Sequence, residues 1–124
     1  MTPTEYSALP EGDLKLAARL AITMGWWVRR DTKTELRVAN PNDFNHNGVV
    51  FVSWFSWSPF TDASIPYGLI GQGVEQVAHT EYGYYAVTGK DTGVRWFKRV
   101  THAIICEYND ADPLGHWTKF LKGE

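Results

Sequence analysis

His102 and Cys106 are the residues whose types and spacing come closest to a catalytic or metal-binding arrangement. They lie four positions apart, so they share one face if the segment is helical. A cysteine beside a histidine can act as an activated nucleophile, and the pair can supply two zinc ligands, with His46, His79 or His116 adding more. A lone cysteine in an apolar stretch is usually a small core residue. We therefore expect no catalytic residue and no metal site, and keep a small enzyme using His102 and Cys106 as an alternative.

Two further patterns resemble functional motifs but lack required residues. Between Gly83 and Gly89-Lys90 there is one residue too many for a phosphate-binding loop, and Asp91 stands where Ser or Thr is needed. Asp110 and Asp112 lack the additional oxygen ligands of a calcium loop. We expect a glycine-bounded hairpin at the first pattern, a solvated helix end at the second, and no cofactor.

Aromatic residues are the unusual part of the composition, with 6 Trp, 6 Tyr and 6 Phe among 124 residues. So many rings either fill the core or remain outside as binding anchors. The stretch Arg95-Trp96-Phe97-Lys98-Arg99 places cations beside rings, and such a combination can stack on bases and neutralise phosphates. We favour the other interpretation, an edge strand protected by charge. The candidate aromatic and basic binding surface consists of Trp54, Trp57, Phe60, Tyr84, Arg95, Trp96 and Arg99.

The charge balance and the termini limit the class of protein. The net charge of −2 does not favour nucleic-acid binding overall, although a local basic patch leaves it possible. A single cysteine suits a reducing compartment. The first residues lack the features of a signal peptide, and no apolar run approaches the length of a membrane span. We expect a cytoplasmic protein that does not enter a membrane.

Hydrophobic periodicity predicts the elements that position these residues. An apolar stripe over residues 14–24 predicts an amphipathic helix ended by Gly25. Residues 26–30 and 35–39 predict two strands joined by a turn. Residues 49–57, VVFVSWFSW, predict a strand that is apolar on both faces and therefore covered on both sides.

The second half of the chain predicts shorter elements. A poor helix follows residues 58–62, strands cover 73–79, 84–88 and 94–100, a helix covers 101–109, and residues 117–121 dock as one helical turn. We find no linker or repeat, so we predict one domain over residues 1–124. Its predicted fold class is α+β, an antiparallel β-sheet with helices packed on both faces, like an α-β-α sandwich.

Three short segments resemble a known family. They are Leu9-Pro10-Glu11-Gly12 to Met24-Gly25-Trp26, then Trp57-Ser58-Pro59-Phe60-Thr61-Asp62, and Ala103-Ile104-Ile105-Cys106. Each is similar to a segment of the phage ABA-sandwich domain, a family of small bacteriophage proteins of unknown function. The resemblance implies an α-β-α layered fold and a phage origin, which would place the protein in the host cytoplasm. That family has no established catalytic residues, so the resemblance implies no chemistry.

Three hypotheses for function follow. The first is a phage-encoded, non-enzymatic binding protein that occupies a host or phage macromolecule, for example a host defence component as an anti-CRISPR protein does. The second is a protein that sequesters a nucleotide or other small ligand by stacking it on Trp54, Trp57, Tyr84 or Trp96. The third is the enzyme alternative. A host or phage protein is the expected partner under the first hypothesis, and a homo-oligomer is left open.

Overall fold

The computed structural model describes residues 1–41, 45–46, 49–50, 53–90 and 93–123. The chain divides into two compact units, which we describe separately. Unit 1 comprises Met1–Trp57 with Leu114–Glu124, and unit 2 comprises Ser58–Pro113. One domain can contain two compact units, so the single domain predicted for residues 1–124 stays a prediction.

The central helix of unit 1 is α2, Asp13–Thr23. Asp13 lies in its first turn, where the helix dipole favours a carboxylate. Small side chains on one face, with Leu20 among them, are buried and let the helix approach its neighbours closely. Beyond its end Gly25 has φ of 82°, and a Cβ there would lie 2.6 Å from the His116 ring. The predicted first helix and its glycine terminator are confirmed.

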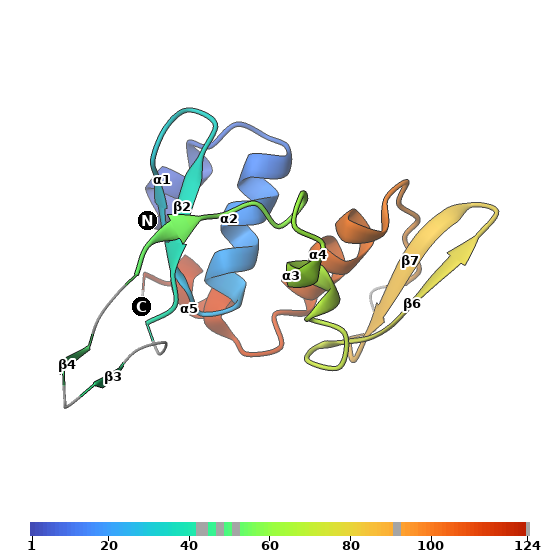
Figure 1. The fold of residues 1–124 in the computed structure, drawn as a ribbon. Helices are drawn as coiled ribbons and strands as arrows, with labels where there is room; N and C mark the ends of the chain where they lie inside the picture. The colour runs from blue at the N-terminus through green and yellow to red at the C-terminus, as the bar shows by residue number, and fades with distance from the viewer. Residues whose placement is uncertain (42–44, 47–48, 51–52, 91–92, 124) are drawn as a thin grey trace. The chain divides into compact units, whose positions relative to one another are not determined.

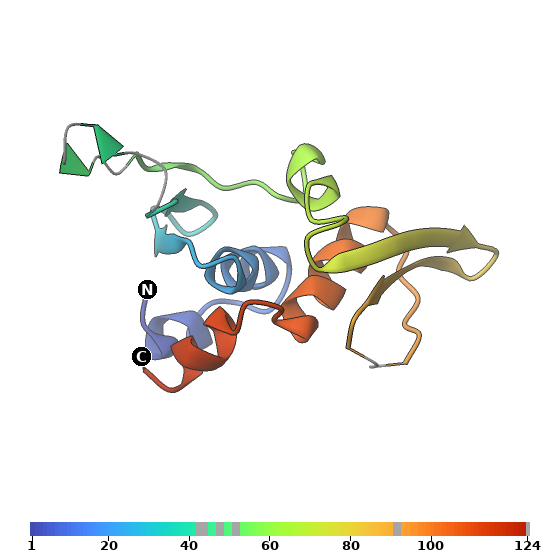
Figure 2. The same cartoon turned by 90° about the horizontal axis from the view of Figure 1, so that it is seen from below.

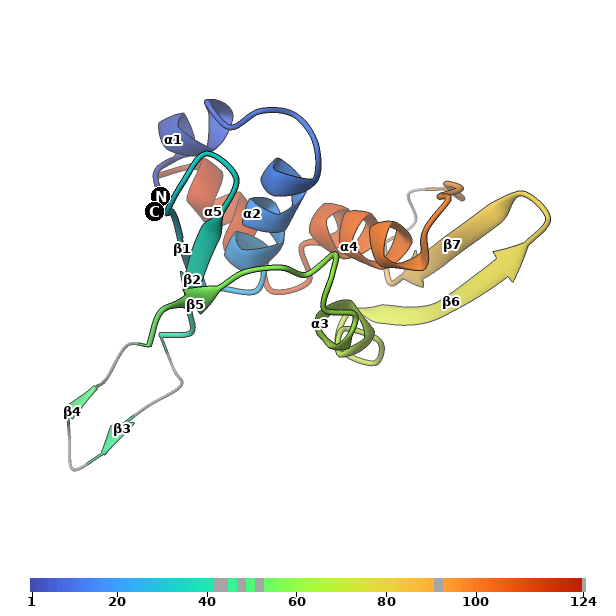
Figure 3. The same ribbon diagram turned by 45° about the horizontal axis from the view of Figure 1, so that its top comes forward.

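A three-stranded antiparallel sheet packs against α2. It contains β1 (Trp27–Arg30), β2 (Leu36–Ala39) and β5 (Phe55–Ser56), in the order β1-β2-β5. Figure 3 shows α2 beside β1 and β2, and both strands contact the helix. The core lies between them, because Val28, Leu36 and Val38 are almost completely buried. The hairpin predicted over residues 26–39 is confirmed.

Two short helices complete unit 1: α1 (Pro3–Ser7) and α5 (His116–Leu121). They lie side by side, because the rings of Tyr6 and Trp117 are 4.9 Å apart and meet edge to face (Figure 2). The guanidinium of Arg19 on α2 lies 4.6 Å from the Trp117 ring. The docked helical turn predicted after residue 116 is confirmed, whereas α1 was not predicted.

The segment predicted as one strand over residues 49–57 belongs to two different sheets. β4 (Val49–Val50) pairs with β3 (Asn45–His46), whereas β5 pairs with β2. Ser53 and both residues of β5 are exposed, so the described part is not covered on both sides. The prediction of a single strand covered on two sides is therefore wrong. An apolar run indicates that a segment is buried, but it does not indicate which strand each half of that segment pairs with.

Unit 2 is built from a β-hairpin and a helix. The strands β6 (Val74–Thr80) and β7 (Gly83–Thr88) are antiparallel, and α4 (Val100–Ala111) packs against both, as Figure 1 shows. The core side of α4 buries Ala103, Ile104 and Ile105 completely. The short helix α3 (Ser64–Tyr67) contacts α4. The hairpin and the final long helix of the sequence analysis are confirmed.

The strand predicted over residues 94–100 is absent from the described part of unit 2. Only one bridge forms, between Tyr84 and Phe97. The segment is held by side-chain ion pairs of Arg95 to α4, described below, and not by a hydrogen-bonded ladder. The poor helix predicted after residue 58 shortens to α3.

The α+β class, with antiparallel strands and helices packed against sheets, is confirmed. The named strands form three hydrogen-bonded sheets in place of the single sheet that was predicted. Among the described residues, no helix has the length and apolar character needed to cross a bilayer.

Candidate binding surface

The tip of the β6–β7 hairpin presents an exposed tyrosine. The backbone N–H of Tyr82 donates to Thr80 Oγ1 at 3.2 Å, which stabilises the tight turn between the strands. Tyr82 itself is 71% exposed, the largest exposure among the large apolar side chains of the structure's described part. A ring held on a short turn and pointing into solvent is a low-entropy contact residue.

The segment that carries Trp96 lies directly beside β7. Tyr84 N–H donates to the Phe97 carbonyl, and Phe97 N–H donates to the Tyr84 carbonyl, each at 2.8 Å. Gly83 makes this approach possible, because a Cβ at that position would lie 2.6 Å from the Phe97 carbonyl oxygen. Gly83 therefore allows both the tight turn and the close approach of the segment that contains Phe97.

Three rings meet where the segment and the hairpin join. The Trp96 ring centroid lies 5.5 Å from that of Tyr82 and 5.2 Å from that of Tyr85. Trp96 is 44% exposed and Tyr85 is half-buried. We name Tyr82, Tyr85 and Trp96 the Trp96 cluster. Edge-to-face and tilted contacts of this kind hold rings in place without removing them from solvent.

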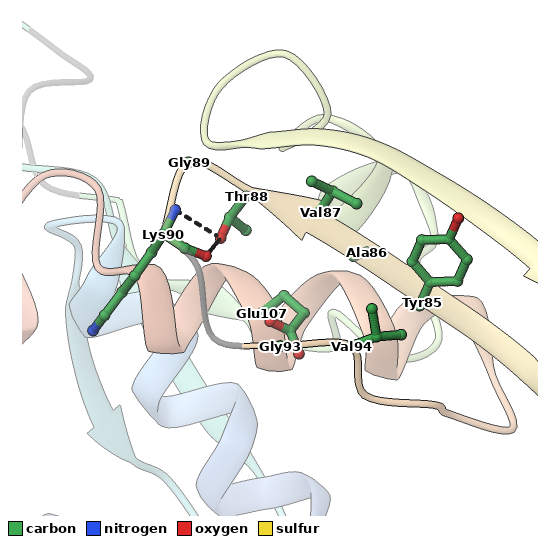
Figure 4. Close-up of a pocket in the computed structure, with 9 residues that line it drawn as sticks. All are labelled: Tyr85, Ala86, Val87, Thr88, Gly89, Lys90, Gly93, Val94 and Glu107. Carbon is green, nitrogen blue, oxygen red and sulfur yellow. Dashed lines mark hydrogen bonds between the residues drawn. The ribbon is translucent and has the colours of Figure 1, made fainter.

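A pocket of about 290 Å³ adjoins the Trp96 cluster at Tyr85. Figure 4 shows Tyr85 and Val94 on one side of it and Lys90 at the other end. Val94 is 62% exposed, so it extends the apolar surface that the rings begin. The surface is concave at this point and flanked by charged groups, as protein-binding surfaces commonly are. The lining residues are Tyr85, Ala86, Val87, Thr88, Gly89, Lys90, Gly93, Val94 and Glu107.

Arg95 fastens the segment to α4. Its Nε donates to Glu107 Oε1 at 2.7 Å, and its Nη2 donates to Asp110 Oδ2. Burial lowers the pKa of Arg95, but the hydrogen bond to Glu107 and the charge of Asp110 raise it more, so the net shift is upward. Glu107 is buried, at 3% exposure, so the pair places a carboxylate inside unit 2 beside a fixed cation. Arg95 therefore has a structural role, although its side chain is partly exposed.

The other predicted site residues of unit 2 lie in two different places. Tyr84 stacks on His79, its cross-strand partner, with ring centroids 4.3 Å apart. Phe60 lies 4.3 Å from the ring of His102, and Arg99 Nη2 is 3.0 Å from His102 Nε2. The structure thus joins Phe60 and Arg99 through His102 and keeps Tyr84 in a separate ring pair.

Trp54 and Trp57 belong to unit 1. Trp57 is only 5% exposed, and its indole N–H donates to the Ala17 carbonyl of α2 at 2.7 Å. The prediction of Trp57 as a surface residue is therefore wrong, because the polar end of the indole finds its partner inside the core. Trp54 is half-buried, and the guanidinium of Arg29 lies 4.4 Å from its ring.

His102 and Cys106 both lie on α4, as the spacing predicted, and both are half-buried. Within the described ranges, no group of three His, Cys, Asp or Glu side chains is placed to hold a metal ion. The acidic end of α4 also follows the prediction of a helix terminus, because Asp112 caps α4 in the left-handed conformation with φ of 44°. The enzyme alternative stays a prediction.

Sequence reasoning missed Tyr82, Tyr85 and Val94. Tyr82 precedes Gly83 in a predicted turn, and turn tips are exposed, so this signal was present. Tyr85 and Val94 could not be found in that way. Their place in the candidate surface depends on the pairing of residue 84 with residue 97, which no local sequence pattern predicts.

Comparisons with known proteins add no family to this geometry. No protein-family model, no curated protein and no solved structure matches the chain. The resemblance to small phage proteins stays a prediction.

Proposed function

We propose that this protein is a non-enzymatic binding protein that acts by occupying a partner macromolecule through the Trp96 cluster. The observation that carries the proposal is the meeting of three rings, two of them exposed by 71% and 44%, where the β6–β7 hairpin is joined by backbone hydrogen bonds to the segment of Trp96. Tyr and Trp dominate the energetically important positions of interfaces, because they bury large areas at small cost in side-chain entropy.

A protein suits this surface better than a nucleic acid. Unit 2 contains seven Asp and Glu against four Lys and Arg, so its charge opposes approach of a phosphate backbone. The arginine nearest the rings, Arg95, already pairs with Glu107 and Asp110. Apolar Val94 and the adjoining pocket supply the concave, partly apolar relief that a protruding side chain of a partner can fill.

The resemblance to small phage proteins supports a more specific form of the proposal. A phage-encoded binding protein would meet its partner in the host cytoplasm, and the partner would be a host or phage protein. In one form of this proposal, the protein binds a host defence component and thereby blocks it.

Differential affinity capture tests the proposal. Tagged wild-type protein and a Tyr82→Ala/Trp96→Ala double variant are incubated with bacterial host lysate, and retained proteins are quantified by mass spectrometry. We expect at least one protein to be retained by the wild type and reduced at least about tenfold by the double variant, because removal of hot-spot rings costs 2 kcal/mol or more.

Tyr67 provides the matched control, because it is 48% exposed and lies in the same unit on α3. Tyr67→Ala should retain the same protein as the wild type. Equal retention by all three proteins, or no protein retained above a bare-tag control, would contradict the proposal.

A further inference from the structure

The three-stranded sheet of unit 1 has an outer face opposite α2. Side chains alternate along a strand, so Trp27 and Arg29 of β1 share one face while Val28 between them enters the core. The register pairs Trp27 with Ala39 and Arg29 with Arg37, and it pairs Arg37 with Ser56 of β5. Trp27, Arg29, Arg37 and Ser56 therefore lie on this face together, beside Ala39, which is completely buried.

Two arginines stand directly opposite each other on this face. Arg29 and Arg37 are cross-strand partners, and like charges in that position destabilise a sheet. Asp31 relieves part of the repulsion, because its carboxylate accepts from Arg37 Nε at 3.1 Å. A guanidinium has five N–H donors, so the bond to Asp31 uses only one of the donors of Arg37. An anion placed between the two guanidinium groups would relieve the remaining repulsion between them, and phosphate matches their geometry.

Two tryptophans flank the arginines. Trp27 is 49% exposed, and Trp54 lies under the guanidinium of Arg29, which is 4.4 Å from its ring. Trp27, Arg29 and Trp54 also line a pocket of about 410 Å³, which is not confined to the outer face because Ile22 of α2 and Phe120 of α5 line it too. Ring faces beside cations are the combination on which single-stranded bases stack while their phosphates are neutralised.

The charge of unit 1 agrees with this chemistry. It contains eight Lys and Arg against seven Asp and Glu, whereas unit 2 carries an acidic excess. The nearby Arg30 is engaged with its own turn, donating to the carbonyls of Thr32 and Lys33. Arg29 and Arg37 are thus the cations of this face that are placed for a ligand.

We propose that the outer face of the β1-β2-β5 sheet binds single-stranded nucleic acid. Trp27 and Trp54 stack on bases, and Arg29 and Arg37 neutralise about two phosphates. A duplex would present its charge but not its base faces, so single strands bind more tightly. This surface is separate from the Trp96 cluster. Nucleic-acid binding here therefore goes beyond the proposed function, and either proposal can be wrong without affecting the other.

Fluorescence anisotropy of a labelled single-stranded oligonucleotide, about ten nucleotides long, tests the proposal at about 50 mM salt. We expect saturable binding whose log affinity falls with log salt at a slope of about −1.4, since each neutralised phosphate contributes about −0.7. Trp27→Ala should weaken binding at least about fivefold without changing that slope. Arg29→Gln should reduce the slope to about −0.7, because it removes one of the two cations that neutralise phosphates.

Lys119→Gln is the matched control, because it makes the same change of charge on an exposed residue of α5 in the same unit. Its affinity should stay within about twofold of wild type. No binding up to about 100 µM protein would overturn the proposal. So would equal affinity for a duplex of the same length, or an effect of Lys119→Gln as large as that of Arg29→Gln.

Discussion

At the scale of single residues, Tyr108 links burial to pH dependence. It lies on α4 and is 2% exposed. Burial raises the pKa of its hydroxyl, and the nearby charge of Asp112 raises it further. In the unfolded chain the phenol ionises near pH 10, whereas in the folded protein it keeps its proton to higher pH. Its contribution to stability is therefore complete below about pH 10 and is lost as the pH rises through the folded value.

Tyr108→Phe should accordingly make stability less sensitive to alkali. Chemical denaturation at intervals between about pH 9 and 11 measures the free energy of unfolding for wild type and variant. We expect the wild type to lose more stability over this range than Tyr108→Phe does. Tyr67→Phe, made at an exposed ring of the same unit, should follow the wild type. Parallel curves for all three proteins would show that Tyr108 ionises alike in both states.

The residue scale also shows why the candidate site was only partly predictable. Composition indicated that the 18 aromatic residues either fill the core or remain outside as anchors, and Trp96 is one that is exposed. Trp57 was expected on the same candidate surface as Trp96, yet Trp57 is buried against the Ala17 carbonyl. The difference depends on a contact between residues 40 positions apart, which alternation along one strand does not contain.

At the scale of elements, the segment around Trp96 depends on Arg95. The predicted strand was wrong because this segment is fastened by ion pairs to α4 and by one bridge to β7. Local patterns predicted α2, the β1–β2 hairpin, the β6–β7 hairpin and α4, since each consists of contacts between neighbours in sequence. They did not predict the pairing of β5 with β2 or the position of the Trp96 segment, since both are long-range.

Arg95→Met tests the fastening of this segment. Buried Glu107 would lose its ion pair, so we expect the free energy of unfolding to fall by about 1–3 kcal/mol, less than for a fully buried pair because the Arg95 side chain is 44% exposed. The double variant Arg95→Met/Glu107→Met should be more stable than the sum of the two single changes implies. Denaturant titration of the four proteins gives the coupling energy. Additive losses would show that the pair does not hold the segment.

At the scale of the whole molecule, the two units carry different charge and different surfaces. Unit 1 has a small basic excess and an outer sheet face with paired arginines, and unit 2 has an acidic excess and the Trp96 cluster. Acidic protein surfaces and phosphate backbones repel, so the charge of unit 2 disfavours nucleic-acid binding there. The difference in charge between the units could not be predicted from the sequence, because the sequence does not show that the C-terminal segment Leu114–Glu124 belongs to unit 1.

Site-specific photo-crosslinking tests the central claim, that the Trp96 cluster is the surface that meets a partner. A photoreactive phenylalanine derivative replaces Tyr82 in one protein and Tyr67 in another, since both rings are exposed, by 71% and 48%, within unit 2. After irradiation in cells that produce the protein, we expect one discrete adduct with a cellular protein from position 82, abolished by Trp96→Ala, and none from position 67. Adducts of equal yield from both positions, or no adduct from position 82, would contradict the account.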